Sequence, residues 1–268
     1  MFKKVFISIK KYGVRIKENL NNWVEKIKNT KKIKISEKRQ LKGWEIFLIA
    51  TIMFGPFILS STQMFFEQST NSISLEKSVD FPQSGILKSI MVDILILSIV
   101  FLFLKWRKFD FNLIPIKINK KGTLFGVFLF IIVAFASDLF FLMVSSEFRK
   151  NIFLGDFNLQ YLSSSIQNIV SLEALHAIFN GFYEEIFFVG ICLAVSKKYW
   201  HHAFIFSLII RFAFHTYQGL INALGITIIL GPIYYYIIRK NRLNLYPIIL
   251  SHILADIFGL TVLSFFIS

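Results

Sequence analysis

Six ionisable side chains lie inside apolar segments of the sequence and combine the residue types needed to activate water. They are Glu184, Glu185, Arg211, His215, His252 and Asp256. Ionisable groups at membrane depth are rare and are functional candidates by default. Carboxylates and imidazoles together can act as a general base with a charge-stabilising donor, or can bind a divalent metal such as zinc. The HExxH zinc-protease motif is absent, and both possibilities stay open. If a metal is bound, its predicted ligands are Glu184, His215, His252 and Asp256.

Two pairs among these residues have helical spacing. Arg211 and His215 are four residues apart, as are His252 and Asp256, so each pair shares one helix face. Counted from the nearest basic connection at about 1.5 Å per residue, these pairs and Glu184 reach a similar depth. The sequence therefore predicts that they meet in one layer of the bilayer.

The two adjacent glutamates lie in the segment FNGFYEEIFFVG, residues 179–190. Neighbouring side chains on a helix diverge by about 100°, so the two carboxylates are not expected to aim at one point. We predict that one of the two faces the site and that the other faces a neighbouring helix.

The elements that must position these residues are apolar runs. Of the 268 residues, 55% are hydrophobic, above the 45–50% of an ordinary soluble domain. Runs of about 18 or more apolar residues can cross a bilayer as helices, and open sheets cannot. The prediction is an all-α, polytopic membrane helix bundle of about seven transmembrane helices. The predicted spans are 45–63, 87–104, 122–144, 168–196, 201–217, 220–238 and 244–267.

Basic charge is concentrated at the start of the chain. Residues 1–42 hold fourteen of the thirty Lys and Arg against three Glu, within a net charge of +14. We interpret residues 1–43 as a basic cytoplasmic or membrane-surface segment that contacts anionic lipid headgroups, and 44–268 as the membrane domain. Nucleic acid is not expected as a partner. The alternation of basic connections predicts a cytoplasmic N-terminus and an external C-terminus.

Other polar residues in the apolar segments have plainer interpretations. Asp93 and Asp138 are expected to be structural or to line a cavity. Glu173 and His176, three residues apart, predict a local pair near the membrane surface, with a substrate groove or a metal site as alternatives. Cys192, the only cysteine, is expected to be a small core residue.

Three short motifs resemble those of the CPBP family of intramembrane endopeptidases, which includes type II CAAX prenyl proteases and the bacterial Abi proteins. EEIFFVG contains the Glu pair and Gly190, but Val189 occupies the position of the usual Arg. RFAFHTYQG supplies His215 with Arg211 in place of Phe, and HILAD supplies His252 with Asp256 in place of Asn. The resemblance covers roughly 165–262.

The resemblance implies that Glu184 activates water for attack on a peptide carbonyl and that His215 helps to hold that water. It also implies that His252 and the residue at position 256 stabilise the oxyanion. An ionised carboxylate only accepts hydrogen bonds, so Asp256 is expected instead to orient His252 or to be protonated. A metal-free mechanism is favoured over a divalent metal. We further predict that Glu185 faces away from the site, toward Arg211. Arg211 then pairs with Glu185 across helices and replaces the Arg missing at Val189.

The resulting expectation is a multi-pass protease of a bacterial plasma membrane, with no cofactor or with a divalent metal such as zinc. Its partner would be a membrane-associated peptide or protein substrate, with peptide or bacteriocin maturation or immunity as possible roles. The alternative is a non-catalytic membrane scaffold or regulatory partner of another membrane protein, such as a sensor kinase or cell-wall enzyme. An ion-coupled transporter is disfavoured because the sequence has no inverted repeat.

Overall fold

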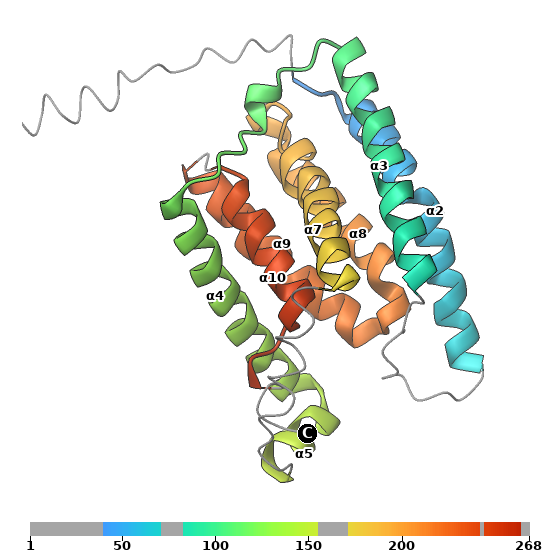
Figure 1. Cartoon of the computed structure of the whole chain (residues 1–268), viewed down its shortest axis with the longest axis vertical. Helices are drawn as coiled ribbons and strands as arrows, with labels where there is room; N and C mark the ends of the chain where they lie inside the picture. The colour runs from blue at the N-terminus through green and yellow to red at the C-terminus, as the bar shows by residue number, and fades with distance from the viewer. Residues whose placement is uncertain (1–39, 71–82, 155–170, 242–243, 264–268) are drawn as a thin grey trace, which may run out of the picture. The chain divides into compact units, whose positions relative to one another are not determined.

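The computed structural model describes residues 40–70, 83–154, 171–241 and 244–263, and every regular element in these ranges is helical. The predicted basic segment 1–43 lies almost entirely outside them. The long helices are drawn in Figure 1. They are α2 (Gly43–Thr70), α3 (Gln83–Trp106), α4 (Lys120–Val144), α5 (Ser146–Leu154), α7 (Leu172–Glu185), α8 (Trp200–His215), α9 (Leu220–Asn241) and α10 (Tyr246–Phe258).

Four helices of the described part are long and apolar enough to cross a membrane. They lie in α2, α3, α4 and α9, at Gly43–Glu67, Gly85–Trp106, Lys120–Val144 and Leu220–Arg239. These confirm a helical membrane protein. The count of seven spans and the orientation of the termini stay predictions.

The remaining three predicted spans correspond to shorter helices. The span 168–196 contains the 14 residues of α7 followed by a π-helix at Ile186–Ile191. The span 201–217 contains all but the first of the 16 residues of α8. In the described part of the span 244–267, the 13 residues of α10 end before Gly259, which has a positive φ of 86°. The backbone N–H groups of Val262 and Leu263 then donate to the Asp138 carboxylate on α4. Hydropathy cannot detect such an end, because the residues after it are still apolar.

Helix α10 packs between α4 and α7, whereas α8 packs against α2 and α9, and α3 packs against α7 (Figure 1). Two glycines permit the close approach of α10. A Cβ atom on Gly181 of α7 would lie 2.8 Å from Ile253 Cγ1 and 3.2 Å from the backbone nitrogen of Ile253. A Cβ atom on Gly126 of α4 would lie 2.9 Å from the carbonyl oxygen of Pro247. Larger residues at either position would push α10 away from its neighbours.

The π-helix begins immediately after the two glutamates. Its wider turn changes the backbone hydrogen-bond pattern, and such turns are frequent at functional sites. The hydroxyl of Ser207 on α8 donates to the carbonyl oxygen of Phe188 at 2.9 Å, so this turn is fastened to α8. Tyr183, on the preceding turn, donates to the carbonyl oxygen of Met53 on α2 at 2.6 Å. The end of α7 is therefore held from two sides.

Candidate active site

The polar site lies where α7, α8 and α10 meet, and it contains all six residues singled out from the sequence. Glu184 and Glu185 are the last two residues of α7, and both are buried, with 1% and 0% of their surface exposed. Helix α8 contributes Arg211 and His215, which are also buried. Helix α10 contributes His252 and Asp256.

Glu185 joins the three helices. Its Oε1 atom accepts a hydrogen bond from Arg211 Nη2 at 2.7 Å and lies 2.6 Å from His252 Nδ1. The Arg211 guanidinium also lies over the Phe188 ring, 4.1 Å from its centroid. The predicted pairing of Arg211 with Glu185 is confirmed as a contact. It places a fully buried charge against a carboxylate, as burial of an arginine requires.

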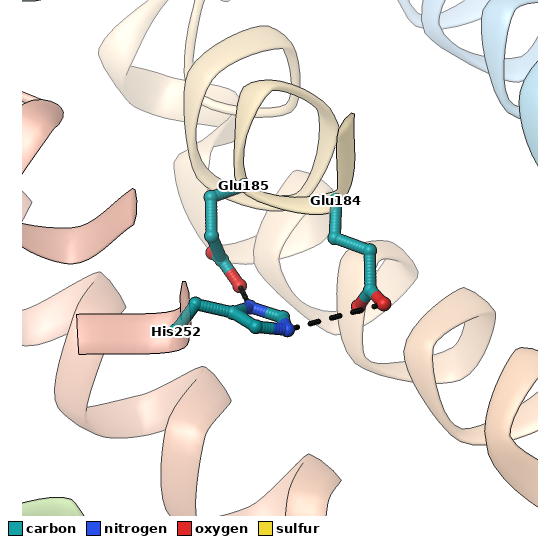
Figure 2. Close-up of side chains that lie close together, drawn as sticks. All are labelled: Glu184, Glu185 and His252. Carbon is teal, nitrogen blue, oxygen red and sulfur yellow. Dashed lines mark hydrogen bonds and ion pairs between the residues drawn. The ribbon is translucent and has the colours of Figure 1, made fainter. Parts of the chain in front are cut away.

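The expectation that Glu185 faces away from the site is wrong. Figure 2 shows both carboxylates extending from the end of α7 toward the two nitrogens of one imidazole ring. His252 Nδ1 contacts Glu185, whereas Nε2 lies 3.9 Å from Glu184 Oε1. Side chains that start about 100° apart on a helix can still converge, because a glutamate is long enough to bend toward a ring lying between them.

The hydrogen bonds of His215 determine which of its nitrogens is free. Nδ1 lies 2.8 Å from the carbonyl oxygen of Arg211, which can only accept, so Nδ1 carries the proton. In the neutral ring Nε2 is then an acceptor, and it lies 3.7 Å from Glu184 Oε2. A water that donates one hydrogen to each of these atoms would match both.

Asp256 lies beside His252, as expected, and also contacts Asn180. Its Oδ1 atom lies 3.5 Å from His252 Nε2, while Oδ2 accepts from Asn180 Nδ2 at 2.8 Å. The nitrogen of His252 that Asp256 faces is the one that also faces Glu184. Glu185, at the other nitrogen, makes the shorter contact with the ring, at 2.6 Å. The side chain of Asp256 is 28% exposed, which is the largest exposed fraction among the six site side chains.

Asn180 was missed by the sequence analysis. The same amide nitrogen that contacts Asp256 lies 3.1 Å from Glu184 Oε1, so Asn180 bridges two carboxylates from different helices. Its position one turn before Glu184 was a signal, since residues four apart on a helix share a face. An uncharged amide is not an ionisable residue, however, and its role becomes evident only when its hydrogen-bond partners are known.

Several polar atoms of the site are buried and have no hydrogen-bond partner among the described residues. They are Oε2 of Glu184, Oε2 of Glu185, and Nε and Nη1 of Arg211. Buried polar groups are normally satisfied by protein or by ordered water. Glu184 Oε2 lies between Arg211 Nη1, at 4.0 Å, and His215 Nε2. This oxygen and His215 Nε2 are therefore two neighbouring acceptors that a donor such as water would satisfy.

The donor set also permits a test of the metal alternative. Glu184, Glu185 and His252 offer ligand atoms within 4.8 Å of one another. Glu185 Oε1 is already engaged by the Arg211 guanidinium, whose charge opposes a cation there. The predicted set of Glu184, His215, His252 and Asp256 shares only Glu184 and His252 with this group, and Nε2 of His252 already lies 3.5 Å from Asp256 Oδ1. A cation held there would polarise a substrate carbonyl as a Lewis acid.

The other singled-out residues lie outside this cluster. His176 Nε2 lies 3.3 Å from Ser89 Oγ on α3, so its contact is to another helix and not the local pair expected with Glu173. Asp138 has the structural role described above, and Asp93 is buried on α3. Cys192 is fully buried, which confirms it as a core residue.

The arrangement defines a class: a helical membrane protein with carboxylates, imidazoles and a guanidinium gathered on three packed helices. A family model described as Type II CAAX prenyl endopeptidase Rce1-like matches residues 166–258, which contain all six site residues. The match confirms the resemblance that the three motifs indicate: residues 166–258 are similar to this endopeptidase family. Searches of curated proteins and of solved structures gave no match.

Proposed function

We propose that the protein is an intramembrane endopeptidase in which Glu184 activates water for hydrolysis of a peptide bond. The observation that carries this proposal is the orphaned Glu184 Oε2 beside His215 Nε2. Both atoms accept hydrogen bonds, and a water has two hydrogens to donate. The water oxygen then keeps its lone pairs free for attack, as general-base catalysis requires.

In the proposed reaction Glu184 takes a proton from the water while the water oxygen forms a bond to the carbonyl carbon of the substrate. The carbonyl oxygen becomes an oxyanion, which needs hydrogen-bond donors. His252, when protonated on both nitrogens, donates from Nδ1 to Glu185 and has Nε2–H available for the oxyanion. Glu184 then passes its proton to the leaving amine, the C–N bond breaks, and a carboxylate and an amine are released.

Arg211 has a supporting role in this proposal. It holds Glu185 at 2.7 Å, and Glu185 in turn orients His252. Its Nη1 atom also lies 4.0 Å from Glu184 Oε2. Val189, which replaces the motif's usual Arg, is buried and apolar. The guanidinium from α8 thus supplies the charge that the first motif lacks.

The substrate class is a membrane-associated peptide or protein, and the family match supports this assignment in general terms. Peptide or bacteriocin maturation and immunity are the roles we propose for a multi-pass protease of a bacterial plasma membrane. Anionic lipid headgroups remain the proposed partner of residues 1–42, of which only 40–42 lie in the described part of the chain.

The test uses purified protein in lipid nanodiscs and a library of membrane peptides, with cleavage read by mass spectrometry. Wild type should cleave a subset of peptides, and Glu184→Gln should reduce the rate about 10²- to 10⁴-fold, the usual contribution of a general base. Parallel reactions with a chelator separate the metal-free mechanism from a metal-dependent one. If Glu184→Gln replaces wild type in a deletion strain without loss of function, the non-catalytic scaffold is the correct alternative.

A further inference from the structure

The candidate base lies where bulk water does not reach it directly. Glu184 is 1% exposed, yet hydrolysis consumes one water for each bond cleaved. We propose that water reaches Glu184 along a polar seam between α3 and α7, an inference that rests on the proposed function. This α3–α7 seam consists of Ser89 and Asp93 on α3 and of Glu173, His176 and Asn180 on α7.

The α7 side of the seam is a continuous stripe. His176, Asn180 and Glu184 are spaced four residues apart, and Glu173 lies on the same face three residues before His176. Exposure falls in order along the stripe: Glu173 is exposed, His176 and Asn180 are half-buried, and Glu184 is buried. At about 1.5 Å per residue the stripe extends roughly 16 Å, which connects an accessible helix end with the base.

The α3 side faces this stripe with two polar residues. Ser89 Oγ lies 3.3 Å from His176 Nε2, which places α3 beside the stripe. Asp93, one turn further along α3, is 5% exposed, and no group among the described residues donates a hydrogen bond to its carboxylate. The buried face of α3 is otherwise apolar, with Ile86, Ile90 and Val100. The two polar residues are thus confined to the part of α3 that faces the stripe.

A purely structural explanation does not account for Asp93. Polar residues that fasten membrane helices to one another do so by bonding across the interface, as Ser89 and His176 do. A buried carboxylate without a donor is costly unless water solvates it. Water at Asp93 would stand next to the half-buried Asn180 and His176 stripe. From there Asn180, whose amide contacts Glu184, connects the seam with the base.

Cysteine labelling tests this directly, because the only native cysteine, Cys192, is fully buried. Ser89→Cys and Asp93→Cys place thiols in the seam. Met91→Cys and Leu95→Cys place thiols at nearly the same depths on the exposed side of α3. The proteins are held in lipid nanodiscs, where both membrane faces are accessible. A charged, membrane-impermeant thiol reagent is added, and labelling is followed by mass spectrometry.

We expect the seam thiols to react at least tenfold faster than their partners in each pair, because a thiolate forms in water and not in hydrocarbon. If the labelling rates are equal within both pairs of cysteine variants, the proposed water route along the α3–α7 seam is wrong. Ser89→Cys is nearly isosteric, so its pair remains informative if Asp93→Cys does not fold. Labelling requires no peptidase activity, and the seam and the proposed function can therefore fail separately.

A second measurement asks whether the seam supplies the reaction. A bulky adduct on Ser89→Cys should lower the rate of peptide cleavage at least tenfold relative to the same variant before modification. The same adduct on Met91→Cys should leave the rate unchanged. If the Ser89→Cys adduct forms completely and cleavage continues at its former rate, water reaches Glu184 by another route and the proposal is wrong.

Discussion

Arg211 and Glu185 lie 26 residues apart in the sequence and form a buried ion pair, with 2.7 Å between Arg211 Nη2 and Glu185 Oε1. The same carboxylate oxygen lies 2.6 Å from His252 Nδ1. One side chain of α7 therefore fixes a residue of α8 and a residue of α10. Disturbing this pair should affect stability and the geometry of the site together, and the two effects can be separated.

Removing only the charge of Arg211 should destabilise the protein. Arg211→Met leaves Glu185 buried without its ion-pair partner, which costs about 3–5 kcal/mol. The double variant Arg211→Met with Glu185→Leu removes both charges and should recover most of that stability. Thermal unfolding in detergent measures both variants.

Measurements of peptide cleavage separate the effect of this ion pair on stability from its effect on the geometry of the site. The double variant should remain inactive although it is stable, because His252 has lost the carboxylate that orients it. A single variant as stable as wild type, or a double variant with normal cleavage, would contradict the assigned role.

Replacing the candidate base should abolish catalysis without unfolding the protein. Glu184→Gln keeps the shape and the Asn180 contact through an amide oxygen but cannot take a proton from water. Cleavage should fall about 10²- to 10⁴-fold, with an unfolding midpoint close to that of wild type. Normal cleavage by this variant would remove Glu184 from the mechanism.

Asn180 should act as a positioning residue for two carboxylates. Asn180→Ala removes a donor to charged groups, worth about 1.5–3 kcal/mol, so kcat should fall about tenfold or more while KM changes little. Asn180→Asp should lower kcat further, because a third carboxylate would then face Glu184 and Asp256. Steady-state kinetics on one cleaved peptide gives both constants.

The control for Asn180 is Asn222→Ala on α9, whose side chain contacts only the carbonyl of Gln218 among the described hydrogen bonds. That variant should keep normal kinetics. If Asn180→Asp is more active than Asn180→Ala, charge repulsion is not what the amide prevents.

Gly181 should control the distance between α7 and α10. Gly181→Ala places a Cβ atom 2.8 Å from Ile253 Cγ1 and 3.2 Å from the nitrogen of Ile253, so the helices must separate. Overpacking of this kind costs about 1–3 kcal/mol, and the contact of Glu185 with His252 should lengthen. Thermal unfolding and cleavage should both decline.

Gly55→Ala on α2 is the matched helical control, because its Cβ atom would make only an ordinary 3.7 Å contact with Thr51. It should be neutral or slightly stabilising. Equal effects of the two alanines would show that helix propensity, and not the α7–α10 contact, dominates.

The sequence by itself determined the apolar character of the helices and the residues whose side chains can take part in catalysis. Both depend on residue type and on spacing within one helix, such as the four-residue intervals of Arg211 with His215 and of His252 with Asp256. The pairing of Arg211 with Glu185 was also predictable, because a buried guanidinium needs a carboxylate and the first motif lacked its own Arg.

Only the tertiary structure decided how these faces are rotated against one another. It brought Glu185 to His252 as well as to Arg211, and it made Asn180 a bridge between Glu184 and Asp256. The tertiary structure also ends α10 early. The Asp138 carboxylate on α4, a helix far away in the sequence, accepts hydrogen bonds from the backbone N–H groups that follow the end of α10. These outcomes depend on close helix contacts such as that at Gly181, and no spacing along a single helix specifies them.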